Sequence, residues 1–167
     1  MNCRICHSPT KQTGLLYRCI SSSCDAAHWD KHAIKRLAEE NENTSKDASP
    51  DWLTSLLREA KVPEFKRGEF YVYTIKLLTN LPEDISARRR ARMPNNGNGR
   101  FYVGKTGLHP YQRYLNHIRG YKASWAAKNM AVSMITFQGP MSHEEAVKRE
   151  PELAQELRER GFDVHSN

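Results

Sequence analysis

All four cysteines of the chain lie between Cys3 and Cys24, and their spacing constrains what this end can fold into. The order Cys3-x2-Cys6-x12-Cys19-x4-Cys24 makes two short cysteine loops, separated by a stretch long enough for a hairpin. A cytoplasmic chain keeps its thiols reduced, so clustered cysteines there indicate metal ligands before disulfides. Because zinc prefers four such ligands in tetrahedral geometry, the spacing predicts one zinc bound by all four cysteines.

The two cysteine pairs do not match the pattern of a zinc site equally well. The first has a two-residue gap and the second a looser four-residue gap, and together they resemble a zinc ribbon or a pair of zinc knuckles. His7 or His28 could replace one cysteine, and free buried thiols or an adventitious disulfide are the alternatives to a metal. Four protein ligands leave no position for water, which predicts a structural zinc. Residues 1–40 contain too little core to fold alone, so the metal would supply folding free energy.

Composition divides the chain and excludes some classes of protein. The polar segment 41–50 is typical of a linker, so we expect a zinc module at 1–40 and a second domain at 51–167. No run of about eighteen apolar residues is present, as a membrane-spanning helix requires. The N-terminus has no apolar stretch of the secretory kind, so we expect a cytoplasmic protein that does not engage membranes.

The chain is basic, with 26 Lys and Arg against 19 Asp and Glu, a net charge of +7. This balance favours a polyanionic partner, most simply nucleic acid. Four of the cations form one run: Arg88, Arg89, Arg90 and Arg92. Residues 94–99, which follow the run, are typical of turns and predict a flexible loop. Such a loop would hold the DNA backbone without reading its sequence, although most charge runs are simply solvated.

Residues 51–167 contain strand-like and helix-like segments. Runs rich in apolar, β-branched or aromatic residues predict strands at 69–77, 100–104 and 130–137. Ser49-Pro50 predicts one helix start and Pro110 another. Ser142 and Glu145 have capping-box spacing, which predicts a final helix that ends at Gly161.

Four short motifs follow one another in this part of the chain. They are Tyr71-Val72-Tyr73-Thr74-Ile75, Phe101-Tyr102-Val103-Gly104-Lys105-Thr106, Tyr111-Gln112-Arg113-Tyr114-Leu115-Asn116-His117 and Glu145-Ala146-Val147-Lys148-Arg149-Glu150. In this order they resemble the signature of the GIY-YIG nucleases, over about Phe70 to Val164. The resemblance implies an α+β fold with a small three-stranded antiparallel sheet flanked by helices. It also implies cleavage of DNA phosphodiester bonds with a divalent metal.

The resemblance assigns the catalytic residues position by position. The residues so assigned are Tyr73, Tyr102, Arg113, His117 and Glu150. Tyr73 and Tyr102 match the tyrosines of the two half-motifs, and Tyr73 would be the general base. Glu150 matches the glutamate that binds the metal.

The chemistry of phosphodiester hydrolysis independently supports these residue types. It needs an activated water and stabilisation of charge on the phosphoryl oxygens. The oxygens of Glu150 suit a hard cation such as Mg²⁺ or Mn²⁺, and the forked charge of Arg113 suits phosphate. A tyrosine relays a proton only if its pKa of about 10 is lowered, which a metal, Arg113 or Lys105 could do. Lys105 is also a candidate DNA contact.

The final helix places Glu150 on an apolar face. Helical spacing puts Glu150 with the following residues: Ala146, Val147, Leu153, Ala154 and Leu157. A carboxylate there is costly unless it is paired or binds a metal. Pro151 directly follows, so we expect the helix to kink or split.

Two further features depart from the family pattern. Tyr73 and Tyr102 are separated by 28 residues where the family has a tight hairpin, so a basic insertion occupies the loop. The family often has a late asparagine, and Asn167 is the candidate here.

Three functions fit the sequence. The first is a metal-dependent DNA endonuclease with a zinc module that helps to hold the substrate. The second is a catalytically inactive nucleic-acid-binding protein with the same fold, and the third is a zinc-ribbon adaptor that binds protein. A single site cuts one strand at a time, so double-strand cleavage requires a homodimer or two events.

Overall fold

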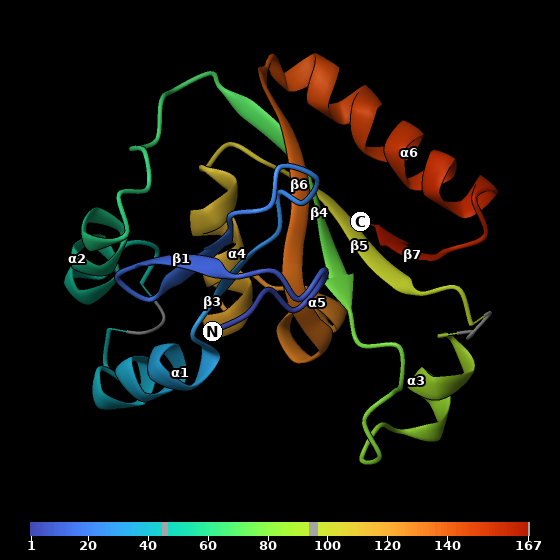
Figure 1. The fold of residues 1–167 in the computed structure, drawn as a ribbon, viewed down its shortest axis with the longest axis horizontal. Coiled ribbons are helices and arrows are strands. Elements are labelled where there is room, and N and C mark those ends of the chain that lie inside the picture. The colour runs from blue at the N-terminus through green and yellow to red at the C-terminus, as the bar shows by residue number, and fades with distance from the viewer. Residues whose placement is uncertain (45–46, 94–96, 167) are drawn as a thin grey trace.

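The computed structural model describes residues 1–44, 47–93 and 97–166, and its described strands form one mixed sheet (Figure 1). The sheet order is β1-β2-β3-β6-β4-β5-β7. The strands are β1 (Thr10–Thr13), β2 (Leu16–Cys19), β3 (Ala27–Trp29), β4 (Phe70–Leu77), β5 (Arg100–Thr106), β6 (Ala131–Met141) and β7 (Asp163–Ser166). All neighbouring pairs are antiparallel except β5 and β7, which are parallel.

The α+β class is confirmed, but the expectation of a small three-stranded antiparallel sheet is wrong, because the sheet has seven strands. The three strands expected from the sequence are β4, β5 and β6, and they lie side by side at its centre. The cysteine segment extends one edge with β1, β2 and β3, and the C-terminal strand β7 extends the other. The sheet therefore grows at both edges from segments that the motifs do not include.

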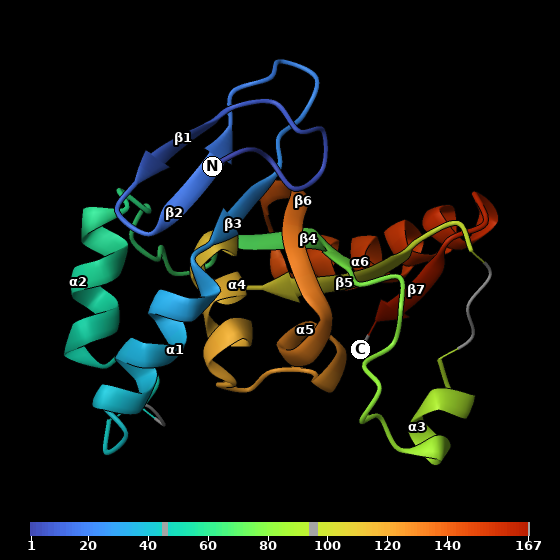
Figure 2. The same ribbon diagram turned by 60° about the horizontal axis from the view of Figure 1, so that its bottom comes forward.

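Helices cover both faces of the sheet (Figures 1 and 2). They are α1 (Lys31–Glu40), α2 (Asp51–Glu59), α3 (Ala87–Ala91), α4 (Pro110–Arg119), α5 (Trp125–Met130) and α6 (His143–Glu159). Side chains of α4 and α5 pack in the main core with β4 and β6, and α6 packs against β4, β5 and β7. Within the described ranges, every helix is too short or too polar to cross a membrane.

The cysteine segment shares a core with the rest of the chain. Ala27 of β3 pairs with Met134 of β6, and the Ser133 hydroxyl donates to the Ala27 carbonyl at 2.9 Å. Trp29 is fully buried, and its indole N–H donates to the carbonyl of Tyr111 at 3.0 Å. The boundary predicted at 41–50 therefore falls between elements that pack on one another.

The final helix begins as its sequence predicts. The Ser142 hydroxyl accepts from the backbone N–H of Glu145 at 3.2 Å, and the Glu145 carboxylate accepts from that of Ser142 at 2.7 Å. The helix is not split at Pro151 but continues to Glu159, and Pro151 lies on its exposed face. Val147 is also exposed, contrary to the expected apolar stripe. Because Pro151 has no N–H group, the carbonyl of Val147, four residues earlier, lacks its helical partner, and this carbonyl belongs to a solvent-facing residue.

The β4–β5 connection is folded rather than a simple loop. It contains α3, with the Arg88–Arg90 run, and it buries Ile85 and Met93 in the main core. Part of the turn expected at 94–99 lies outside the described residues, as does Asn167.

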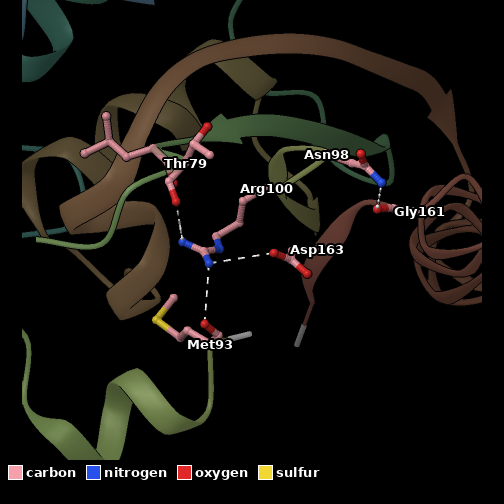
Figure 3. A network of polar contacts seen from close by, with 7 residues as sticks. Thr79, Met93, Asn98, Arg100, Gly161 and Asp163 are labelled. Carbon is pink, nitrogen blue, oxygen red and sulfur yellow. Dashed lines mark hydrogen bonds and ion pairs between the residues drawn. The ribbon is translucent and has the colours of Figure 1, made fainter. Parts of the chain in front are cut away.

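A buried arginine fixes the two ends of this connection (Figure 3). The Arg100 guanidinium donates to the carbonyls of Leu78, Thr79 and Met93 at 3.5, 3.3 and 3.4 Å. It also lies 3.7 Å from the carboxylate of Asp163 in β7. Because buried carbonyls and charges need such partners, Arg100 ties the connection to the sheet.

Candidate functional site

The two motif tyrosines face each other from neighbouring strands, β4 and β5. Their ring centroids are 6.1 Å apart, and both side chains are buried. Gly104 lies opposite Tyr73 in the register. A Cβ atom at Gly104 would come within 2.7 Å of the Tyr73 hydroxyl and 2.9 Å of a Tyr102 ring carbon. Only a glycine leaves room for both rings, which explains the residue type in the second half-motif.

His117 of α4 completes this group. Its Nε2 atom lies 2.7 Å from the Tyr73 hydroxyl oxygen, in a buried hydrogen bond. Burial, with the nearby charge of Arg113, lowers the pKa of His117 to about 3, so its imidazole is neutral at pH 7. Burial also raises the pKa of Tyr73 well above its usual value, and Arg113 opposes that rise. A protonated phenol thus lies against a neutral base.

Glu150 of α6 and Lys105 of β5 form a second group. The Lys105 ammonium donates to Oε2 of Glu150 at 2.5 Å, and the Glu150 side chain is only 3% exposed. The other carboxylate oxygen, Oε1, is buried and has no hydrogen-bond partner in the described part of the chain. A buried carboxylate oxygen without a partner is unfavourable, and a divalent cation is a partner that would satisfy it.

The alternation of side chains along a strand places the two groups on different faces of the sheet. Tyr102 and Gly104 point towards α4, whereas Val103 and Lys105 point towards α6. In the described residues, neither a hydrogen bond nor an ion pair joins the Tyr73–His117 group to the Lys105–Glu150 group.

One pocket of about 330 Å³ includes Lys105 of the second group among its lining residues. Lys105 lines it from β5, and Arg113, Asn116 and Lys122 line it from α4 and the turn that follows. The Arg113 guanidinium is held by the Lys122 carbonyl at 2.9 Å. Three cations on one pocket favour an anion such as a phosphodiester.

Asn116 is a pocket residue that sequence reasoning missed. Its side chain is 1% exposed, and its Oδ1 accepts from the Arg119 guanidinium at 2.8 Å. Its amide nitrogen has no partner among the described residues, and the same is true of Tyr102 Oη and His117 Nδ1. Most buried polar atoms in proteins are satisfied. Asn116 also lines the pocket, so a ligand there is a candidate partner for its amide. The spacing in the sequence could have indicated it, because Asn116 lies three residues after Arg113 and so on the same face of one helix.

The arginine run lies away from this pocket. The connection that contains the run leaves β4 after Leu77 and joins β5 at Arg100, which is at the other end of that strand from Lys105. Arg89 stacks over the Trp125 ring at 4.2 Å, and Arg90 donates to the Pro82 carbonyl at 3.3 Å.

The four cysteines converge as their spacing predicts. The sulfur atoms of Cys3, Cys6, Cys19 and Cys24 all lie within 4.8 Å of one another. The Cys3–Cys24 and Cys6–Cys19 sulfurs are 3.8 and 3.4 Å apart. Sulfurs at about 2.3 Å from a tetrahedral zinc are roughly 3.8 Å apart, and a disulfide bond is much shorter. This four-cysteine cluster can therefore hold a metal ion such as zinc.

Hydrogen bonds to the sulfurs support the same interpretation, and the pKa values of the cysteines are shifted in opposite directions. The backbone N–H groups of Ile5 and Ser21 donate to the sulfurs of Cys3 and Cys19, both at 3.4 Å. Hydrogen bonds from Ser8 lower the pKa of Cys6 to about 6, whereas burial raises that of Cys24 to about 12. Four thiolates this close would repel one another, so all four ionise together only around a cation.

His28, an alternative ligand, is not part of the cluster. Its Nε2 lies 3.2 Å from the sulfur of Met1, and its ring stacks on Tyr17 with centroids 5.4 Å apart. His7 is likewise outside the four-residue group.

Comparison of the chain with protein-family models, curated proteins and solved structures found no match. The structure brings Tyr73, Tyr102 and His117 together, and it pairs Lys105 with Glu150. Arg113 acts on the first group through its charge and lines the pocket with Lys105.

Proposed function

We propose that the chain is a metal-dependent endonuclease that hydrolyses DNA phosphodiester bonds, with a structural zinc on its four cysteines. The observation that carries the proposal is the cationic pocket lined by Lys105 and Arg113, of which Lys105 also binds Glu150 and Arg113 acts on Tyr73 and His117 through its charge. A phosphodiester in this pocket would contact Lys105 and Arg113 at once. The likeness of the motifs to GIY-YIG nucleases supports the same activity.

Tyr73 and His117 are the proton-handling pair in this proposal. The neutral imidazole accepts the phenol proton when Tyr73 takes one from water, so charge does not build up on the phenol. Arg113 limits the rise in the pKa of Tyr73, and its charge lowers the pKa of His117 as well. Tyr102 keeps the Tyr73 ring in place, and Gly104 allows the contact.

Glu150 fits a divalent metal by its chemistry. Its Oε1 atom is buried without a partner, and Mg²⁺ or Mn²⁺ takes one or two carboxylates with waters and substrate phosphates. When bound, such an ion would stabilise negative charge on the phosphoryl oxygens. Lys105 holds the other carboxylate oxygen and so fixes the orientation of Glu150.

Arg113 and Lys122 are the candidate phosphate-binding residues. The Arg113 fork is oriented by the Lys122 carbonyl, and its remaining N–H donors suit phosphate oxygens. Asn116 adds an amide donor held in place by Arg119. The same contacts bind any DNA backbone without reading its sequence.

One observation favours a second function. The Tyr73–His117 and Lys105–Glu150 groups lie on different faces of the sheet, as the alternation along β5 requires. A chain in which they never act on one phosphate would be a nucleic-acid-binding protein of the same fold without catalysis.

The deciding experiment uses supercoiled plasmid with Mg²⁺ or Mn²⁺, against a sample without divalent metal. We expect metal-dependent nicking. Glu150→Gln should reduce it by about a hundredfold or more, while DNA affinity stays near that of the wild type. Glu152→Gln, an exposed carboxylate on the same helix, is the matched control and should cut normally.

The outcomes separate the two functions. Cleavage by Glu150→Gln at the wild-type rate would remove Glu150 from the mechanism. DNA binding without any cleavage by the wild type would establish the inactive binding protein instead. Nicked plasmid that precedes linear plasmid indicates one site per encounter, and linear product from the start indicates a homodimer.

A further inference from the structure

We propose that a second pocket, between the cysteine end and α4, binds one unpaired nucleobase and prefers guanine. This pocket has a volume of about 310 Å³ and is lined by Arg18, Cys19, Asp25, Tyr111, Thr136 and Phe137. Its size is that of a small-ligand site with a few polar groups on aromatic walls. The inference rests on the proposed function in that it takes nucleic acid as the partner.

The pocket contains two opposite charges that do not pair with each other. Arg18 and Asp25 both line it, and in the described residues neither makes an ion pair. The Nε atom of Arg18 is buried without a hydrogen-bond partner in the same part of the chain. Arg18 thus offers hydrogen-bond donors and Asp25 offers acceptors, which suits a ligand that carries both acceptors and donors.

Aromatic rings form the walls beside these charges. The Tyr111 and Phe137 centroids are 5.7 Å apart with an interplanar angle of 83°. The Arg18 guanidinium lies over the Tyr111 ring, 5.0 Å from its centroid. Aromatic rings and guanidinium planes are the surfaces on which unpaired bases stack.

Guanine matches the two charges better than the other bases do. Its Watson–Crick edge carries two adjacent donors, the ring N–H and the amino group, which fit the two oxygens of a carboxylate such as Asp25. Its O6 and N7 atoms are acceptors, which suit the guanidinium of Arg18. Adenine and cytosine present an amino donor without an adjacent ring N–H, and thymine presents a ring N–H without an amino group.

The pocket is joined rigidly to the candidate catalytic residues. Tyr111 lies in the first turn of α4, the helix that carries Arg113 and His117. The Trp29 indole fixes that turn through the Tyr111 carbonyl, and the cysteine segment supplies Arg18 and Asp25. A base held here would therefore set the position of its strand relative to the cationic pocket.

The test measures binding of four short oligothymidylates, with guanine, adenine, cytosine or thymine at the central position, by fluorescence anisotropy without added divalent metal. We expect the guanine strand to bind about tenfold more tightly than the other three. Asp25→Asn should bring the four affinities to within about twofold. Asp84→Asn, an exposed aspartate on the β4–β5 connection, should keep the preference. Zinc content of the Asp25→Asn protein is measured alongside, so that loss of the cysteine site is not mistaken for loss of the contact.

The results distinguish this inference from the proposed function. Equal affinity of the wild type for all four strands, or a preference for adenine or cytosine, overturns the guanine pocket while plasmid cleavage stands on its own assay. Failure to bind any of the strands, together with absence of plasmid cleavage, overturns both. A guanine preference that survives Asp25→Asn with zinc retained overturns the assignment of Asp25.

Discussion

The four-cysteine cluster and the buried site around Tyr73 are both concentrations of polar atoms, but the chain builds them differently. The cluster comes from two short loops that are near in sequence, and Cys6 is exposed. The buried site needs β4, β5, α4 and α6, with Tyr73 and Glu150 far apart in the chain. A site made by local loops follows from spacing, whereas a site made by tertiary packing depends on the whole sheet.

The two regions should also respond differently to the loss of one group. A structural metal supplies folding free energy, so its removal acts on stability. Loss of a buried hydroxyl or carboxylate in a packed site should instead lower the reaction rate more than the stability, because the neighbouring side chains maintain the fold. Two predictions test this contrast, and a third concerns a segment outside both regions.

The largest effect is expected at the cysteines. Protein purified without chelator should contain one zinc per chain by metal analysis. Cys19→Ser should lower the free energy of unfolding by several kcal/mol, on the order expected for a structural zinc ligand. Because β3 pairs with β6 and Trp29 lies in the main core, thermal unfolding monitored by circular dichroism should shift for the whole chain.

Ser22→Ala, an exposed neighbour, is the control for this change and should unfold like the wild type. Absence of zinc from the purified protein would contradict the metal site. A shift limited to a minor part of the unfolding transition would show that residues 1–40 are a separate unit, as the sequence led us to expect.

Tyr73→Phe should affect cleavage far more than stability. The ring stays packed, and the loss of its hydroxyl leaves His117 Nε2 without its partner, which costs about 1–2 kcal/mol. Cleavage of plasmid should fall by roughly a hundredfold or more, since the pair that handles the proton is broken.

Tyr71→Phe provides the matched change on the same strand. Its hydroxyl donates to Glu69 near the surface at 3.2 Å, away from His117, so its cleavage rate should stay within about twofold of the wild type. Equal rates for the two variants would remove Tyr73 from catalysis.

The smallest effect is expected from the arginine run, which belongs to neither region. Arg88 and Arg92 are exposed, whereas Arg89 stacks on Trp125 and Arg90 binds the Pro82 carbonyl. Replacing Arg88 and Arg92 by alanine should make the salt dependence of DNA binding shallower, by up to about 0.9 for each phosphate that the protein no longer neutralises. Replacing Arg89 and Arg90 should instead loosen the connection. An unchanged salt slope in the first variant would make the run a solvated surface.

Much of the local structure followed from the sequence. The cysteine spacing, the capping box at Ser142 and Glu145, and the three central strands are properties of short segments, and each is present. The full sheet could not be predicted in this way, because β3 joins β6 through one residue pair between distant segments.

The candidate site shows the same division. Residue types and order pointed to Tyr73, His117 and Glu150, but which side chains meet depends on strand register and helix packing. The 2.7 Å contact between Tyr73 and His117 joins β4 to α4, and no sequence pattern fixes that distance. Asn116 and the pocket of Arg18 and Asp25 emerged only from three-dimensional proximity.

Arg100 gives the β4–β5 connection a use in protein engineering. Its guanidinium binds the carbonyls of Leu78, Thr79 and Met93, so both ends of the connection are held beside the sheet. Ile85 and Met93 provide the apolar anchors on either side of α3. We therefore expect that a reporter peptide inserted within residues 86–92 loosens α3 while the central strands keep their register.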